Sequence, residues 1–256
     1  MSWLDVVAVL LAGVAAGTIN TVVGSGSLIT FPTLLALGID PVVANVSNTV
    51  GLVPGSVSGA IGYRRELAGQ RGRLVSLGVA ALVGGLAGAV LLLTLDEDVF
   101  EAVVPVLILL GCVLVVAQPR LSAWVRARRD EDAQPRRRGS WAVWVAILLA
   151  SAYGGYFGAA QGVLHVAILG LGLDDTLQRI NASKNVIAAI VNAVAAALFV
   201  FVADVDWAAA GLIAVGATVG GQVGATVGRR LPDWALRGFV VVVGVAAVVQ
   251  FTLTEA

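Results

Sequence analysis

Apolar residues fill long, nearly uninterrupted runs along this 256-residue chain, and short clusters of polar or charged residues separate the runs. About 20 apolar residues suffice for a helix to cross the ~30 Å hydrocarbon core of a bilayer. With Gly, Pro and charge as breaks, the pattern predicts two sets of five helices. The first set covers residues 3–22, 26–37, 43–62, 74–95 and 99–117, and the second covers 141–160, 162–172, 180–203, 207–228 and 235–253. The second helix of each set is too short to cross comfortably, so it is predicted to be a half-helix or a re-entrant element.

Composition agrees with a chain whose main solvent is lipid. Hydrophobic residues make up 59% of the chain and charged residues only 12%, with a mean hydropathy of +0.94, whereas a soluble domain carries about 25% charged residues. We therefore predict an all-α, multi-pass integral membrane protein. The formal net charge of zero argues against a nucleic-acid partner. The first apolar run has no basic residues before it, so it is expected to be a membrane helix rather than a cleaved signal peptide.

A charged segment without an apolar face divides the chain. Residues 119–140, PRLSAWVRARRDEDAQPRRRGS, are predicted to be a cytoplasmic linker between a first membrane repeat, residues 1–118, and a second one, residues 141–256. Cytoplasmic loops carry an excess of Lys and Arg. The loops with that excess contain Arg64, Arg65, Arg71 and Arg73, then Arg120 through Arg138, then Arg229, Arg230 and Arg237. This assignment places both termini outside the cytoplasm, in a protein of the cytoplasmic membrane.

Corresponding loops of the two halves carry opposite charge. Between the third and fourth helices the first half has RRELAGQRGR and the second half has DVDW. An odd number of crossings per half produces this pattern, so the halves are predicted to be inverted repeats of about five helices each, an architecture of many secondary transporters. Chance scatter of charge in short loops is the alternative. The sequence also repeats, with Gly26 opposite Gly162, Leu28 opposite Leu164, Asn45 opposite Asn181 and Ser47 opposite Ser183.

Two pairs of polar segments interrupt the apolar runs at corresponding places. The first pair is GTINTVVGSGS, residues 17–27, and GGYFGAAQG, residues 154–162; the second is NVSNT, residues 45–49, and NASKN, residues 181–185. Paired interruptions in two halves point to a transporter's substrate site, although glycines also let helices approach closely. Each segment of the second pair begins a long apolar helix, whose N-terminus offers N–H groups to an anion.

The ionisable residues indicate which class of substrate the protein carries. Lys184 is the single lysine and lies near the start of an apolar helix, so it is predicted to balance the charge of an anion; extension to the cytoplasmic interface is the alternative. No acidic residue lies in mid-span, so a cation carrier is poorly supported. The single histidine, His165, either couples proton movement to transport or packs as a hydrogen-bonded residue. Cys112 has no partner, and neither a metal nor a cofactor is expected.

No ATP-binding loop and no hydrolytic triad is present in the sequence, so we expect neither an ATP-driven pump nor an enzyme. The residues predicted to line an anion site are Asn20, Ser25, Gly26, Asn45, Ser47, Asn48, Gln161, Gly162, Asn181, Ser183, Lys184 and Asn185.

The polar segments also resemble a known family. AGTINTVVGSGSLITFPTLLALGIDPVVANVSNTV with YRRELAGQRGR, and GGYFGAAQGVLHVAILGLG with INASKNVIAAIVNAV, are similar to the two repeats of the sulfite exporter TauE/SafE family of membrane transporters. The resemblance covers nearly the whole chain. It implies transport of a small sulfur-containing anion, such as sulfite or an organosulfonate. The family's glycine run reads GSGS here, and its lysine stands only in the second half, which leaves the particular anion open.

The sequence therefore predicts a secondary transporter of a small anion, whose partners are that anion and the lipid bilayer. An anion-selective channel or facilitator, or a transporter of another small sulfur compound, is the alternative. A membrane-embedded enzyme and a subunit active only with a partner are further rivals. The direction of transport and the oligomeric state, including a homo-oligomer, stay open.

Overall fold

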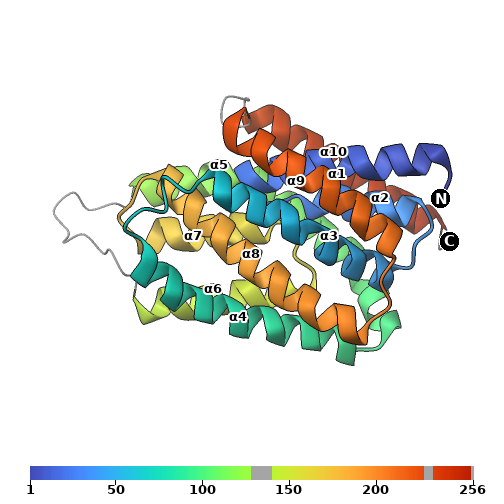
Figure 1. The fold of residues 1–256 in the computed structure, drawn as a ribbon, viewed down its shortest axis with the longest axis horizontal. Coiled ribbons are helices and arrows are strands. Elements are labelled where there is room, and N and C mark those ends of the chain that lie inside the picture. The colour runs from blue at the N-terminus through green and yellow to red at the C-terminus, as the bar shows by residue number, and fades with distance from the viewer. Residues whose placement is uncertain (128–139, 228–232, 255–256) are drawn as a thin grey trace.

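The structure, a computed structural model, describes residues 1–127, 140–227 and 233–254, and all regular secondary structure within these ranges is helical (Figure 1). The first half contains α1 (Trp3–Val22), α2 (Ser27–Ala36), α3 (Pro41–Gly62), α4 (Arg71–Thr94) and α5 (Glu97–Ala127). The second half contains α6 (Trp141–Tyr156), α7 (Gln161–Gly172), α8 (Leu177–Val202), α9 (Trp207–Thr226) and α10 (Asp233–Thr254). The predicted helices and their order are confirmed.

Two predicted helix ends are wrong. α5 continues through Pro119 to Ala127 rather than ending at residue 117, and the Arg and Ala residues after the proline favour helix. Residues 128–139 of the predicted linker lie outside the described residues. α6 ends at Tyr156 rather than residue 160, because Gly158 adopts a left-handed φ of 77° that a helix cannot contain.

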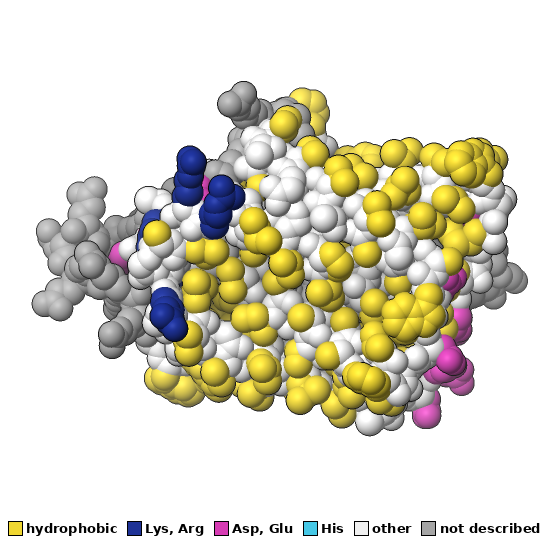
Figure 2. Space-filling view, viewed as in Figure 1, with side chains coloured by type: hydrophobic (Ala, Val, Ile, Leu, Met, Phe, Trp, Pro, Cys, Tyr) yellow, Lys and Arg dark blue, Asp and Glu magenta, His cyan; other side chains and the backbone are white. Residues whose placement is uncertain are grey.

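Five of the described helices, namely α1, α4, α5, α8 and α9, are long and apolar enough to cross a membrane. α2 and α7 have 10 and 12 residues, which is too short for a crossing. In Figure 2, basic side chains gather at one end of the molecule and a group of acidic ones lies at the other, with apolar side chains between them. We call these the basic end, with Arg64, Arg65 and Arg71, and the acidic end, with Asp96, Glu97 and Asp98.

Each half begins with a helical hairpin that turns inside the protein. Val23 and Gly24 donate backbone hydrogen bonds to the carbonyl of Ile19, just as Phe157 and Gly158 donate to the carbonyl of Tyr153. Gly24 and Gly158 both have positive φ, 94° and 77°. The α1–α2 hairpin and the α6–α7 hairpin are therefore structural equivalents.

This equivalence changes the register of the sequence repeat. It aligns residue 24 with residue 158, so Gly26 corresponds to Ala160 rather than to Gly162, and the predicted pairing is shifted by two residues. α7 is two residues longer than α2, and this extra length restores the predicted pairing of Asn45 with Asn181, the fifth residues of α3 and α8.

The hairpins point in opposite directions. The connection from α2 to α3 lies at the acidic end, beside the start of α1 (Figure 1). The connection from α7 to α8 lies at the basic end, where Asp175 pairs with Arg73 at 2.9 Å. The tips of the two hairpins meet inside the protein, where the Gly162 N–H donates to the Gly24 carbonyl at 3.0 Å.

Contacts between helices pair up when the halves are exchanged. α1 packs on α9 as α6 packs on α4, α2 packs on α10 as α7 packs on α5, and α3 packs on α8 at the centre. Equivalent contacts in the two halves need glycine: a Cβ on Gly220 would lie 2.1 Å from the Val14 carbonyl oxygen, and one on Gly84 would lie 2.2 Å from that of Leu148. Such contacts are expected of a two-fold repeat. An axis lying in the membrane plane stays a prediction.

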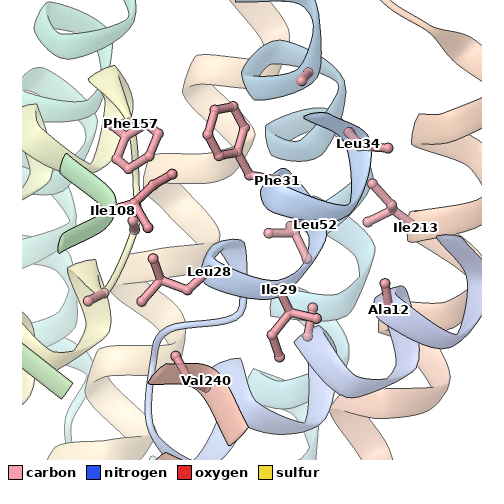
Figure 3. Packing of buried hydrophobic residues seen from close by; sticks show 14 of the residues in the cluster. Ala12, Leu28, Ile29, Phe31, Leu34, Leu52, Ile108, Phe157, Ile213 and Val240 are labelled. Carbon is pink, nitrogen blue, oxygen red and sulfur yellow. The ribbon is translucent and has the colours of Figure 1, made fainter. Parts of the chain in front are cut away.

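The apolar core holds the short helix α2 in place. Leu28, Ile29 and Phe31 of α2 are buried among residues of α1, α3, α5, α9 and α10 (Figure 3). Phe31 packs edge-on against Phe157 of the opposite hairpin, with ring centroids 5.1 Å apart. Burial of each such side chain contributes roughly 1.5–3 kcal/mol where water is the alternative, so the start of α2 is fixed by packing inside the protein.

Candidate functional site

The carboxyl end of α1 lies inside the protein and is closed by side chains of α8. The Lys184 side chain is fully buried, and its Nζ donates to the backbone carbonyls of Asn20 at 2.8 Å and Thr21 at 3.0 Å. Asn185 Nδ2 donates to the same Thr21 carbonyl at 3.4 Å. The last carbonyls of a helix lack intrahelical partners and carry the negative end of its dipole. Lys184 therefore does not extend to the interface.

Matching asparagines make an equivalent contact in both halves. Asn181 Nδ2 donates to the carbonyl of Val22, the last residue of α1, at 3.5 Å. Asn45 Nδ2 donates to the carbonyl of Tyr156, the last residue of α6, at 2.9 Å. Each half thus supplies the asparagine that closes the interior helix end of the other half. The Oδ1 atoms of both asparagines are buried without a hydrogen-bond partner.

A chain of polar side chains crosses the interface between the halves. Asn192 Nδ2 donates to Ser56 Oγ at 3.0 Å, and Asn20 Nδ2 reaches the same oxygen at 3.4 Å. Gln161 Nε2 donates to Asn192 Oδ1 at 3.0 Å. Sequence reasoning missed Ser56 and Asn192, although a lone asparagine in the apolar run of α8 was a usable signal.

The amino ends of α2 and α7 also lie inside the protein, and neither has a side-chain cap. Gly26 and Ala160 occupy the cap positions, and neither residue has a side-chain oxygen that could accept from the first-turn N–H groups. Ser25, immediately before the α2 cap, is 1% exposed, and its hydroxyl has no partner. Two uncapped helix N-termini are therefore directed into the middle of the protein.

These are not the helix N-termini that the sequence predicted. α3 begins at Pro41, and the Asp40 carboxylate accepts from the N–H groups of Val42 and Val43. α8 begins at Leu177, and the Thr176 hydroxyl accepts from the Arg179 N–H. Capping side chains thus occupy the first turns of α3 and α8, whereas the polar segments 45–49 and 181–185 lie in their second turns.

The structure brings most of the predicted lining residues to the hairpin tips but separates others. A Cβ on Gly162 would lie 3.0 Å from Lys184 Cδ and 2.5 Å from Gly24 Cα. The residues around the end of α1 and the starts of α2 and α7 are Asn20, Ser25, Gly26, Gln161, Gly162, Asn181, Lys184 and Asn185. Asn45 lies at the other hairpin tip, at the end of α6, whereas Asn48 accepts from the Thr30 hydroxyl of α2.

Two of the three predicted serines, Ser47 and Ser183, make contacts away from the hairpin tips. Ser47 accepts from the backbone N–H of Asp206, in the α8–α9 connection, at 2.8 Å. Ser183 donates to Gln70, in the α3–α4 connection, at 2.6 Å. They are equivalent anchors, each binding one half to a connection in the other half. Both serines are close to site residues in sequence, but their position around the helix turns them away from the site.

His165 lies in α7 with its ring fully buried. Its Nε2 is 3.3 Å from the Ser151 hydroxyl of α6, while Nδ1 has no partner. The Ser151 contact is that of a packing residue, and coupling to protons stays a hypothesis. Among the residues that the structure describes, no three His, Cys, Asp or Glu side chains group as a metal site would require.

Comparison with known proteins agrees with the architecture. The family model of the sulfite exporter TauE/SafE matches residues 9–251. The "Probable membrane transporter protein YfcA" of Escherichia coli K12 is 26% identical over 229 residues, which cover 89% of this chain and 82% of that protein. A "Probable membrane transporter protein" of Haemophilus influenzae is 25% identical over 243 residues, covering 93% of this chain and 91% of that protein. With a match over nearly its whole length, the chain belongs to the sulfite exporter TauE/SafE family of membrane transporters.

Proposed function

We propose that this transporter carries a small sulfur oxyanion, sulfite or an organosulfonate, across the cytoplasmic membrane. The observation that carries the proposal is the pair of uncapped N-termini, α2 and α7, inside the protein. Half-helices whose positive ends face an anionic group near the midplane are typical of secondary transporters. The family description, a sulfite exporter, supports the sulfur chemistry of the cargo.

Several donors near the hairpin tips suit an anion. Lys184 uses two of its three ammonium protons on the α1 carbonyls, which leaves one for a ligand. The buried hydroxyl of Ser25 has no partner and can donate a hydrogen bond. These groups would replace part of the hydration shell of the anion, and the positive dipole ends of α2 and α7 would face it. Lys184 would balance its charge.

Alternating access would follow from the repeat. The two halves are interleaved, with α1 and α3 packed on α9 and with α4 packed on α6 and α8, and each half supplies one hairpin to the centre. Rocking of one inverted half against the other would expose the hairpin tips first to one side of the membrane and then to the other. The basic end would face the cytoplasm and both termini the opposite side, by the excess of Arg at that end.

The test is uptake of radiolabelled sulfite by liposomes that contain the purified chain, with sulfate and an organosulfonate as comparators. Saturable flux of sulfite or the organosulfonate supports the proposal, and absence of flux for all three anions overturns the substrate assignment. A pH gradient across the liposome tests coupling to protons. Single-channel recording distinguishes an anion channel, which would conduct far above the turnover of a carrier.

A further inference from the structure

A polar cavity lies at the basic end, between the two halves. It has a volume of about 610 Å³. The first half lines it with the start of α4 and the preceding turn, and the second half with the α7–α8 connection and the first turn of α8. Its lining residues are Gly69, Gln70, Gly72, Arg73, Asp174, Asp175 and Arg179.

A carboxylate already occupies the cationic part of this cavity. Asp175 Oδ2 accepts from Arg73 Nη2 at 2.9 Å, and Asp175 Oδ1 lies 2.8 Å from Arg179 Nε. The Arg73 side chain is 5% exposed, so this pair is largely removed from water. Two arginines of different halves thus hold one oxyanion group, and charge-assisted bonds of this kind are among the strongest that proteins make to oxyanions.

The same place has anion-binding capacity that Asp175 does not use. Arg73 Nε is buried without a hydrogen-bond partner. α4 begins at Arg71 with no side-chain cap. Gln70 occupies the cap position, but its amide donates to the Glu66 carbonyl and accepts from Arg73. An uncapped helix N-terminus binds anions through free N–H groups and a favourable dipole. The uncapped start of α4, the Arg73 guanidinium and the polar cavity therefore all favour an anionic ligand.

The cavity also connects to the central site. Ser183 donates to Gln70 at 2.6 Å and lies 3.5 Å from Arg73 Nη2. The next residue along α8 is Lys184, whose ammonium contacts the end of α1. A displacement of Arg73 or Gln70 would therefore act on the helical turn that carries Lys184.

We propose that this cavity is a second anion site, where the transported oxyanion replaces the carboxylate of Asp175 between Arg73 and Arg179. The inference rests on the proposed function, because it takes the cargo to be an oxyanion. Replacement would also release the contact between Arg73 of the first half and Asp175 of the second. Binding at the basic end would thus loosen one link that holds the halves together there.

The experiment measures sulfate binding to the purified full-length chain in detergent, by the shift of the thermal unfolding midpoint with sulfate at constant ionic strength, chloride serving as the reference salt. Asp175→Asn removes the competing carboxylate and keeps its shape, so sulfate should bind about tenfold more tightly than to the unchanged chain. Asp174→Asn removes the same charge from the same cavity wall and is the matched control. It should change sulfate affinity little.

The double variant Asp175→Asn with Arg179→Gln should not show the gain in sulfate affinity that Asp175→Asn shows alone. If Asp175→Asn does not fold, Arg179→Gln alone still tests the site, since it should weaken the sulfate response several-fold. Equal sulfate affinity in the unchanged chain, Asp175→Asn and Arg179→Gln would overturn the inference and leave the cluster as a structural brace. That result together with saturable sulfite flux removes this site alone, whereas a tenfold gain without flux of any anion supports the site and removes the transport proposal.

Discussion

Lys184 Nζ lies 2.8 Å from the backbone carbonyl oxygen of Asn20, so a cation of the second half closes the end of the first helix of the first half. The ammonium is fully buried and is held by the negative end of a helix dipole instead of a carboxylate. Such an arrangement binds the cation without neutralising it with a full negative charge. A small anion could therefore complete the site.

Lys184→Met tests the charge at nearly constant side-chain length. The change removes this donor from both carbonyls, of which that of Thr21 keeps the Asn185 amide, and a buried group left unsatisfied costs about 1–3 kcal/mol. We expect a lower unfolding midpoint in detergent and loss of sulfite flux in liposomes. Asn185→Ala isolates the effect of the charge, because this neighbouring site residue loses only the 3.4 Å bond to the Thr21 carbonyl and no charge. Unchanged flux in Lys184→Met would show that the lysine serves the fold alone.

The contact between the hairpin tips tolerates no side chain. In Gly162→Ala the new Cβ would lie 2.5 Å from Gly24 Cα, which forces the two tips apart and lengthens the bond from the Gly162 N–H to the Gly24 carbonyl. Overpacking of this kind costs roughly 1–3 kcal/mol. We expect flux to fall by about tenfold or more, since a displacement of about 1 Å can cost that much in a preorganised site.

Gly211→Ala provides the comparison within a helix. A Cβ at Gly211 of α9 would meet no atom within 4 Å, so the change should be neutral or slightly stabilising. The thermal unfolding midpoint and the sulfite flux of Gly162→Ala and Gly211→Ala, measured side by side, test whether the hairpin tips are in close contact. Equal behaviour of Gly162→Ala and Gly211→Ala would contradict a close contact between the tips.

Helix positions were predictable because lipid imposes long apolar runs, and Gly, Pro and charge mark where such runs stop. The break after α6 was harder to place, since GGYFGAAQG contains several glycines and the sequence does not say which of them takes positive φ. The same ambiguity shifted the repeat by two residues at Gly26. Local pattern therefore gave the helices but not the register of the hairpins.

The candidate site was predictable only as two polar regions. Asn20 and Lys184 are 164 positions apart, and only packing brings the end of α1 to α8. Ser47 and Ser183 lie in the same polar segments, yet helix rotation directs them to Asp206 and Gln70. Sequence repetition identifies which residues correspond between halves, whereas their partners depend on how the halves meet.

The bond from Asn192 to Ser56 should couple the two halves. The distance is 3.0 Å and both side chains are at least 95% buried. We expect Ser56→Ala and Asn192→Ala each to lower thermal stability, and the double variant to lose less than the sum of both. Interhelical hydrogen bonds in membranes contribute about 0.6 kcal/mol on average in double-mutant cycles, so the expected coupling is of that order. Strict additivity of the midpoint shifts would show that the bond contributes nothing.

Orientation in the membrane can be tested with single cysteines. Cys112 is buried and is the only cysteine, so a Cys112→Ala background allows one reporter at a time. Arg64→Cys and Asp98→Cys place exposed thiols at the basic and acidic ends. Because cytoplasmic loops retain the excess of Arg, a membrane-impermeant maleimide should label Asp98→Cys in intact cells but reach Arg64→Cys only after lysis. The reverse pattern would place the basic end outside and invert the assignment of both termini.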